Sequence, residues 1–254
     1  GENVSEASVT VQATGQRKIG LFTLTFIDLQ VPMAGLPITV SRTYDSRDKA
    51  KGDFGVGWRL GLQTLRLRAN RVLGTGWLRT VSGPTVSLSP TAEHKISVTL
   101  PDGRIEEFDM VVSPTANIGS LDFTTVTGFV ARPGTLGALE VLGNRDLIIL
   151  DDGAATVLVD DTTLEYYDPT RFRYTAANGT VIEIHRADGV TRMTDTNGNT
   201  LVFGPEGITH SSGKSVAFTR DVQGRITQIV DPLGHVQTYA YDANGDLASR
   251  TDAT

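Results

Sequence analysis

Residues 215–251 read SVAFTRDVQGRITQIVDPLGHVQTYAYDANGDLASRT and are punctuated by three Asp-x-x-Gly cassettes. The cassettes span Asp221 to Gly224, Asp231 to Gly234 and Asp242 to Gly245. Asp at the first position and Gly at the fourth are typical of a type I turn, and Pro232 has the fixed φ that suits the second position. Each cassette is therefore predicted to reverse the direction of the chain.

The runs between these turns are short and rich in β-forming residues, so the segment is predicted to be an antiparallel meander. Asp221 and Asp242 lie 21 positions apart, and so do Phe218 and Tyr239. A fixed period of this size is typical of a stacked array in which each repeat is one hairpin. Aromatic side chains at equivalent positions are then expected to pack across strands on one face.

The composition of the 254-residue chain favours an all-β fold. Hydrophobic residues make up 39% of the chain, which is enough for a buried core, and 27 residues are glycine. Thr and Val are abundant, whereas stretches of strong helix formers are hard to find, so we expect little or no helix. The predicted fold class is an antiparallel ribbon of β-hairpins.

Charge and cysteine content exclude several classes of function. The formal net charge is −6 and no basic run is longer than a pair, so nucleic-acid binding is not expected. The chain has no cysteine, which excludes disulfides, thiolate metal sites and cysteine nucleophiles. No apolar run reaches about 18 residues and the first residues lack the pattern of a signal peptide, so we expect neither a membrane span nor a signal peptide in this sequence.

No residue pattern predicts a catalytic, cofactor-binding or metal site, and we predict that the chain is not an enzyme. The adjacent acids at 151–152 and 160–161 would point to opposite faces of a strand, which does not suit acid–base catalysis. The four histidines are far apart in sequence and are expected to face solvent or to flank turns: His94, His185, His210 and His235.

If the chain bound a metal ion, calcium would be the strongest candidate, because residues 195–199 and 242–246 place several side chains with oxygen atoms close together in tight loops. Both loops lack the sixth-position glycine of an EF-hand loop, and the loop at 242–246 also lacks the twelfth-position glutamate. We therefore interpret them as Asn-Gly and Asp-x-x-Gly turns.

In chain order we predict three regions: a lead-in arm or strand over residues 1–18, an N-terminal β region over 19–165, and a hairpin meander over 166–254 that continues beyond the sequence. Both alternating faces of residues 21–31 carry apolar groups, so this strand is expected to be covered on both sides. Further hairpins are predicted over residues 96–108 and 147–159.

Residues 52–58, Gly-Asp-Phe-Gly-Val-Gly-Trp, combine three glycines with two large aromatic side chains. Their spacing matches neither a Walker motif nor a dinucleotide fingerprint, and no helical pattern follows them, so phosphate binding is not expected. We predict instead a structural corner that holds Phe54 and Trp58, in which the glycines permit unusual backbone angles.

Two segments carry motifs of a known family. Phe218 to Leu247, with Tyr239 and with Tyr241-Asp242 followed by Ala-Asn-Gly245, resembles a YD repeat. Residues 21–58 present an apolar strand, then Arg42-Thr43-Tyr44-Asp45, then Gly55-Val56-Gly57-Trp58, which resembles the region that opens the repeat core of bacterial Rhs proteins. The chain thus resembles the Rhs/YD-repeat family, which includes Tc toxin components and teneurins.

The resemblance implies a β-ribbon that spirals into a partial hollow shell, of which this chain is the N-terminal part. Such shells commonly enclose a variable C-terminal toxic or signalling segment, so the implied partners are the rest of the shell and that segment, and the implied location is secreted or cell-surface. Some members cleave themselves at paired Asp-Pro-x-Gly motifs. This chain has a single copy, Asp231-Pro232-Leu233-Gly234, which we interpret as a turn without self-cleavage.

The sequence therefore favours a structural, encapsulating module. The alternative is a cell-surface β module that binds glycans or a protein through exposed aromatic side chains, the candidates being Trp58, Trp77, Tyr166, Tyr167, Tyr239 and Tyr241. The final strand, Leu247 to Thr251, is expected to leave an open edge through which the chain self-associates.

Overall fold

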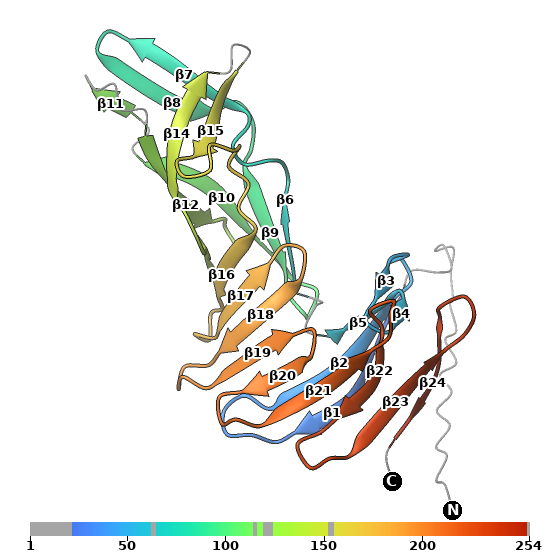
Figure 1. Cartoon of the computed structure of the whole chain (residues 1–254). Coiled ribbons are helices and arrows are strands. Elements are labelled where there is room, and N and C mark those ends of the chain that lie inside the picture. The colour runs from blue at the N-terminus through green and yellow to red at the C-terminus, as the bar shows by residue number, and fades with distance from the viewer. Residues whose placement is uncertain (1–21, 62–64, 114–115, 119–123, 152–154, 253–254) are drawn as a thin grey trace, which may run out of the picture. The chain divides into compact units, whose positions relative to one another are not determined.

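The computed structural model describes residues 22–61, 65–113, 116–118, 124–151 and 155–252, which form two compact units (Figure 1). Unit 1 combines the described residues before Leu65 with those from Asn197 onward, and unit 2 comprises the described residues of Leu65–Thr196. Every paired strand in the described residues is antiparallel to its neighbour, and none of these residues forms an α-helix. The prediction of an all-β, antiparallel hairpin fold is confirmed.

Because the described residues form strands and connections, no helix among them is suited to cross a membrane.

Unit 1 contains a hairpin meander, a three-stranded sheet and one very short hairpin. Six strands of the meander follow one another side by side in chain order (Figure 1): β19 (Thr200–Gly204), β20 (Gly207–His210), β21 (Ser215–Arg220), β22 (Ile226–Val230), β23 (Val236–Tyr241) and β24 (Leu247–Thr251). The three-stranded sheet has the order β1-β2-β5, and β3 pairs with β4. Their bounds are β1 (Thr23–Val31), β2 (Ile38–Asp45), β3 (Lys51–Gly52), β4 (Gly55–Val56) and β5 (Trp58–Leu60).

Unit 2 contains a nine-stranded sheet with the order β11-β8-β7-β15-β14-β12-β10-β9-β6. The bounds of these strands are β6 (Arg66–Ala69), β7 (Trp77–Ser82), β8 (Thr85–Pro90), β9 (Lys95–Thr99), β10 (Ile105–Ser113), β11 (Ala116–Ile118), β12 (Thr124–Ala131), β14 (Asp146–Asp151) and β15 (Thr156–Asp160). A second group of strands has the order β13-β16-β17-β18. Its bounds are β13 (Ala138–Val141), β16 (Arg171–Thr175), β17 (Val181–His185) and β18 (Gly189–Thr194). The pairs β9–β10 and β14–β15 are the two hairpins that the sequence predicted.

The core of unit 2 lies where β10 and β12 face β16. Phe108 contacts Tyr174 edge-on at 6.4 Å between ring centroids, and Phe129 contacts Phe172 at 5.9 Å. The Tyr174 hydroxyl donates a 2.8 Å hydrogen bond to the buried carboxylate of Glu106. Burial raises the pKa of Tyr174, and the hydrogen bond and negative charge of Glu106 raise it further, so this tyrosine stays a donor.

Strand β1 differs from its sequence-based prediction, because it is not covered on both faces. Ile27 is 65% exposed, and the only fully buried side chain of the strand is Asp28. The pairing of β1 with β2 shifts between Ile27 and Leu29. Such a β-bulge adds one residue to one strand and interrupts the alternation of faces. Strict alternation therefore could not describe the strand beyond Ile27.

The boundaries between the three regions predicted in chain order stay a prediction. The predicted arm over residues 1–18 lies outside the described residues. Residues 19–64 and 197–254 share unit 1, so that unit is built from two segments that are distant in sequence.

The expectation of solvent-facing or turn-flanking histidines is wrong for His94, which is only 3% exposed and stacks on Trp77 at 4.4 Å between centroids. Its Nε2 lies 2.5 Å from the carbonyl oxygen of Thr75. Burial lowers the pKa of His94, and the charge of Arg71 lowers it further. His210 is also buried, although it begins a turn as expected.

His94 should make the stability of unit 2 depend on pH. Its pKa is lowered on folding, so below about pH 6.5 the unfolded chain binds a proton that the folded chain does not. The free energy of unfolding should therefore fall as the pH drops from 7 to 5, with a slope of up to about 1.4 kcal/mol per pH unit. Urea unfolding followed by Trp77 fluorescence, in a Trp58→Phe background, measures this slope.

His94→Phe keeps an aromatic ring against Trp77 but cannot titrate, so the slope between pH 7 and 5 should largely disappear. His185→Gln is the control, because His94 is left intact and the slope should persist. An unchanged slope in His94→Phe would assign the pH dependence to another group.

Candidate functional site

The three Asp-x-x-Gly cassettes close three similar turns of the meander. The N–H of the fourth residue donates to the carbonyl of the first at 2.9 Å for Gly224, 3.1 Å for Gly234 and 3.1 Å for Gly245. These glycines have φ values of +82°, +91° and +88°. A type I turn followed by a left-handed residue is the common three-residue hairpin loop. Glycine adopts the left-handed conformation at little cost, which explains the fourth position.

The Asp side chains cap these turns by accepting hydrogen bonds from main-chain N–H groups. Asp221 accepts from Gln223 and Arg225 at 2.9 and 3.0 Å, and Asp242 accepts from Asn244 and Asp246 at 2.9 Å each. Partial burial alone would raise the pKa of Asp221, but its hydrogen bonds with Arg225 and Gln223 outweigh burial and lower it. The carboxylates of Asp221 and Asp242 therefore accept hydrogen bonds within their own turns. The second of these turns, residues 242–246, is one of the two loops with the oxygen ligands of a possible calcium site.

The Asp231-Pro232-Leu233-Gly234 motif has the same turn geometry. Asp231 accepts from the N–H groups of Leu233 and His235 at 2.8 and 2.9 Å, and its second oxygen lies 2.8 Å from His235 Nδ1. Arg225 makes the equivalent contact with Asp221. His235 therefore occupies the position whose side chain binds the Asp carboxylate of its turn. Burial raises the pKa of Asp231, but the contacts with His235 and Leu233 outweigh it and lower the pKa. The absence of self-cleavage stays a prediction.

A buried carboxylate joins the N-terminal strands to the last strands of the meander. The bulge in β1 turns Asp28 inward, and its side chain is only 1% exposed. Arg42 Nε on β2 donates to both carboxylate oxygens, at 3.0 and 2.8 Å. The two residues are close because β1 and β2 are adjacent strands.

The strands of the meander complete the shell of donors around Asp28. Tyr239 Oη donates to Oδ2 at 2.9 Å, and Arg250 Nε forms an ion pair with Oδ1 at 3.3 Å. Gln237 Nε2 and Arg250 Nη2 donate to the main-chain carbonyl of Asp28 at 2.8 and 3.0 Å. Burial raises the pKa of Tyr239, and the charge and hydrogen bond of Asp28 raise it further. Tyr239 therefore stays protonated and keeps donating.

Aromatic rings surround the Arg42 guanidinium. It lies 5.2 Å from the centroid of Phe26, 5.3 Å from that of Trp58 and 6.0 Å from that of Tyr239. Tyr44 packs against Trp58 at 5.2 Å. A guanidinium within about 6 Å of a ring face is attracted by the ring quadrupole, so the cation is held by rings as well as by Asp28.

The corner at residues 52–58 makes a second set of contacts with the meander. Asp53 Oδ1 accepts a 2.9 Å hydrogen bond from Arg220, and the Asp53 carbonyl accepts one of 2.7 Å from the Ile226 N–H. Phe54 is fully buried, with its ring 4.9 Å from that of Tyr239. These contacts dock the corner onto β21 to β23.

Glycine is required where the corner meets the third cassette. Gly55 has a φ of +98°, and a Cβ placed on it would lie 2.6 Å from the carbonyl oxygen of Gly245. Gly57 has a φ of +74°, and its Cβ would lie 2.8 Å from the ring of Tyr44. Any larger residue at these positions would have to shift the neighbouring chain.

Tyr241, the second tyrosine of the repeat motif, bonds within the meander. Its hydroxyl donates to the carbonyl of Ile226 at 2.6 Å, and the Arg225 guanidinium lies 4.1 Å from its ring centroid. Burial raises the pKa of Tyr241, and the acids Asp221 and Asp53 add to that effect while Arg225 opposes it.

The predicted motif residues fall into two groups. The contact region between the N-terminal strands and the meander, which we call the seam, brings together Arg42, Tyr44, Gly55, Gly57, Trp58, Tyr239, Tyr241 and Gly245. Asp45 contributes its main-chain N–H, which donates to the Gly57 carbonyl at 3.0 Å, and its carboxylate binds Arg47. The turn of Asp231, Pro232 and Gly234 does not take part in these contacts, and its Leu233 is 81% exposed.

Sequence reasoning missed the acids and arginines at the centre of the seam: Asp28, Asp53, Arg220 and Arg250. One signal was available, because Asp28 is the single charged residue in the strand sequence TLTFIDLQV. A lone acid on an otherwise apolar strand indicates a buried partner.

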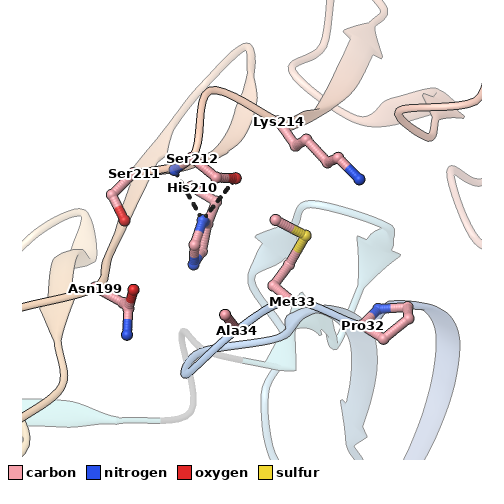
Figure 2. Close-up of a pocket in the computed structure, with 8 residues that line it drawn as sticks. All are labelled: Pro32, Met33, Ala34, Asn199, His210, Ser211, Ser212 and Lys214. Carbon is pink, nitrogen blue, oxygen red and sulfur yellow. Dashed lines mark hydrogen bonds between the residues drawn. The ribbon is translucent and has the colours of Figure 1, made fainter. Parts of the chain in front are cut away.

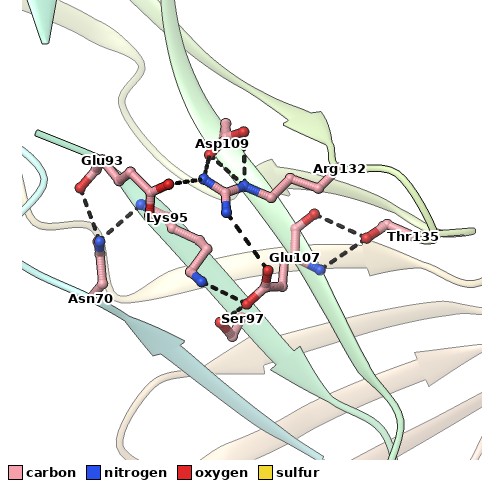
Figure 3. Close-up of polar contacts among 8 residues, drawn as sticks. All are labelled: Asn70, Glu93, Lys95, Ser97, Glu107, Asp109, Arg132 and Thr135. Carbon is pink, nitrogen blue, oxygen red and sulfur yellow. Dashed lines mark hydrogen bonds and ion pairs between the residues drawn. The ribbon is translucent and has the colours of Figure 1, made fainter.

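A second polar cluster lies in unit 2, where Arg132 is surrounded by acids (Figure 3). Its Nε lies 2.9 Å from both oxygens of Asp109, and its Nη2 lies 3.0 Å from Glu93. Lys95 Nζ donates to Glu107 at 2.7 Å, which lowers the pKa of Glu107. In this cluster the negative charges of the acids are paired with the positive charges of Arg132 and Lys95. Within the described ranges, no group of three or more His, Asp or Glu side chains is arranged to hold a metal ion.

Most aromatic candidates for glycan binding are used internally. Trp77, Tyr167 and Tyr239 are buried, and Trp58 and Tyr241 pack in the seam. Tyr166 is 51% exposed.

A protein-family model described as RHS Repeat matches residues 220–254. Residues 220–254 therefore carry an Rhs/YD repeat. A second model, described as Domain of unknown function (DUF6531), matches residues 18–70. No protein in the curated set matches the chain. Asp28, Arg42 and Asp53 belong to the first matched segment in chain order, while Arg220, Tyr239 and Arg250 belong to the Rhs repeat, so the seam is where the two segments meet.

Replacing Asp28 should destabilise unit 1 severely. Asp28→Asn keeps the shape of the side chain but leaves Arg42 and Arg250 without their buried counter-charge, which costs about 3–5 kcal/mol. Asp45→Asn is the control, because its ion pair is with the exposed Arg47 side chain and should matter far less to stability than the buried charge of Asp28. Urea unfolding followed by Trp58 fluorescence in a Trp77→Phe background measures both. Equal losses in the two variants would contradict a central role for Asp28.

Two glycine substitutions should separate backbone strain from a steric clash at the Rhs repeat. Gly234→Ala meets no atom within 4 Å and carries only the strain of its positive φ, about 1 kcal/mol. Gly55→Ala adds a clash with Gly245, so its cost should be about 3 kcal/mol. The same Trp58 unfolding assay compares them. Similar losses would show that the corner can move away from the third cassette at little cost.

Proposed function

We propose that this chain is a structural module at the start of an Rhs shell, where the N-terminal strands anchor the first repeats of a β-walled container. The single observation that carries the proposal is the seam. Asp28 and Asp53 of the N-terminal segment bond to Arg220, Tyr239 and Arg250 of the meander. Such contacts fix where the repeat array begins and in which register.

In this proposal the module acts by positioning strands and turns, not by catalysing a reaction. Each hairpin pairs with the next along the meander, and the three cassette turns connect β21, β22, β23 and β24 in series. In the Rhs family the repeats line a shell around a C-terminal toxic or signalling segment. We extend that role to this chain and propose the rest of the shell and such a segment as its partners, with secretion or cell-surface display as its location.

The alternative function, binding of a glycan or of a cell-surface protein through aromatic side chains, has less support. Such sites present aromatic faces to solvent, whereas five of the six candidates pack inside the units. The proposed role is likewise non-catalytic, because the polar side chains of the seam are engaged with one another.

The open edge of β24 provides a test of the proposed array. β24 pairs with β23 on one side and ends the order of described strands, so its other side is available to a further strand. Exposed strand edges pair with other chains. We therefore expect the isolated chain to form concentration-dependent dimers, measured by sedimentation velocity.

Ala248→Lys places a charge on this edge strand and should shift the protein toward monomer by at least tenfold in the dissociation constant. Ala217→Lys is the matched control, since Ala217 is exposed on β21, which is paired on both sides. A chain that stays monomeric at high concentration, or equal effects of the two lysines, would contradict an array that grows at β24.

A further inference from the structure

A pocket of about 470 Å³ lies in unit 1 between two turns (Figure 2). One wall is the connection from β1 to β2, with Pro32, Met33 and Ala34. The opposite wall is the turn from β20 to β21, which runs from His210 to Lys214, together with Asn199. None of these residues takes part in the seam.

His210 occupies the first position of a turn like those of the cassettes. The Gly213 N–H donates to the His210 carbonyl at 2.9 Å, and Gly213 has a φ of +86°. Where the cassettes use an Asp carboxylate, His210 Nδ1 accepts a 3.0 Å hydrogen bond from the Ser212 N–H. A main-chain N–H can only donate, so Nδ1 is the acceptor and the neutral ring carries its proton on Nε2.

This Nε2–H group is a buried donor without a partner. His210 is 3% exposed, and Nε2 has no hydrogen-bond acceptor within the described part of the chain. Figure 2 shows Nε2 pointing away from the turn, toward the side of the pocket where Asn199 and Ala34 are drawn. A buried donor without an acceptor is unfavourable, so an acceptor supplied from outside the chain would be stabilised there.

The remaining walls define the chemistry of that acceptor. Lys214 is exposed at the rim and adds a positive charge, while Pro32, Met33 and Ala34 provide an apolar surface. No Asp or Glu is among the lining residues, which disfavours a cation. A metal ion at Nε2 would need a lone pair on that nitrogen, which the proton already occupies.

We propose that this pocket binds a carboxylate carried on a short apolar chain. The His210 Nε2–H donates to one carboxylate oxygen, Lys214 pairs with the negative charge, and the apolar chain packs against Met33 and Pro32. Charge-assisted hydrogen bonds of this kind are stronger than neutral ones. The carboxylate can come from a small organic acid or from an acidic side chain of a peptide, and the inference does not depend on the proposed shell function.

Nuclear magnetic resonance of the full chain tests the proposal. The probes are butyrate and the peptide acetyl-Ala-Glu-Ala-amide, with butyramide and the Gln peptide as neutral counterparts. We expect at least one carboxylate probe to shift the His210 Nε2 resonance and the Met33 methyl resonance to saturation, at least tenfold more tightly than its neutral counterpart. The responding probe identifies the source.

Two variants of the pocket test the assigned contacts. His210→Asp restores the residue of the other cassettes, so the turn can form, but it replaces the donor by a negative charge and should weaken binding at least tenfold. Lys214→Gln leaves the turn unchanged and should weaken binding of the carboxylate toward that of the neutral probe. His235→Gln, in a different cassette, is the control and should bind normally.

The proposal is wrong if neither carboxylate probe gives a saturable shift, or if butyrate and butyramide bind equally. It is also wrong if Lys214→Gln and His210→Asp both bind as the natural chain does. Should His210→Asp fail to fold, the Lys214→Gln measurement decides alone.

Discussion

Unit 1 depends on the burial of one carboxylate, that of Asp28. A charge taken out of water is costly unless other groups replace its hydration, and here the hydrogen bonds donated by Arg42 and Tyr239 and the ion pair with Arg250 do so. Two of these groups lie more than 200 positions away, since Tyr239 is 211 residues further along the chain. The acid is therefore satisfied only after the N-terminal strands and the meander have met. This makes the seam a condition for a stable unit 1 rather than a consequence of it.

A buried acid held by side-chain donors also occurs at Asp53, which binds Arg220. In unit 2 the equivalent acid is Glu106, which binds Tyr174. A strand whose buried face is purely aliphatic can slip by two residues and still bury apolar groups, because its side chains alternate with a period of two. A buried acid with fixed donors has only one satisfied register. We infer that these anchors select the pairing that the apolar residues alone would leave open.

Much of the fold follows from local chemistry and was predictable from the sequence. The cassettes predicted their turns because Asp and Gly at fixed spacing act within four residues, and the paired strands followed from alternation. The bulge at Asp28 was not predictable in this way, since the partner strand β2 determines where pairing shifts. The burial of His94 depends on Trp77, which lies in another strand. Sequence alternation also could not reveal that Arg220 and Arg250 meet acids near the other end of the chain.

The two tyrosines of the Rhs repeat donate to partners in different parts of unit 1. Tyr241 donates to the carbonyl of Ile226, so its bond stays inside the meander. Tyr239 instead donates to Asp28, which lies in the N-terminal segment that precedes the repeats. The Tyr241 bond therefore needs only the meander, whereas the Tyr239 bond forms only where the N-terminal segment supplies Asp28. Within unit 1, Tyr239 is thus the tyrosine that joins the Rhs repeat to the N-terminal strands.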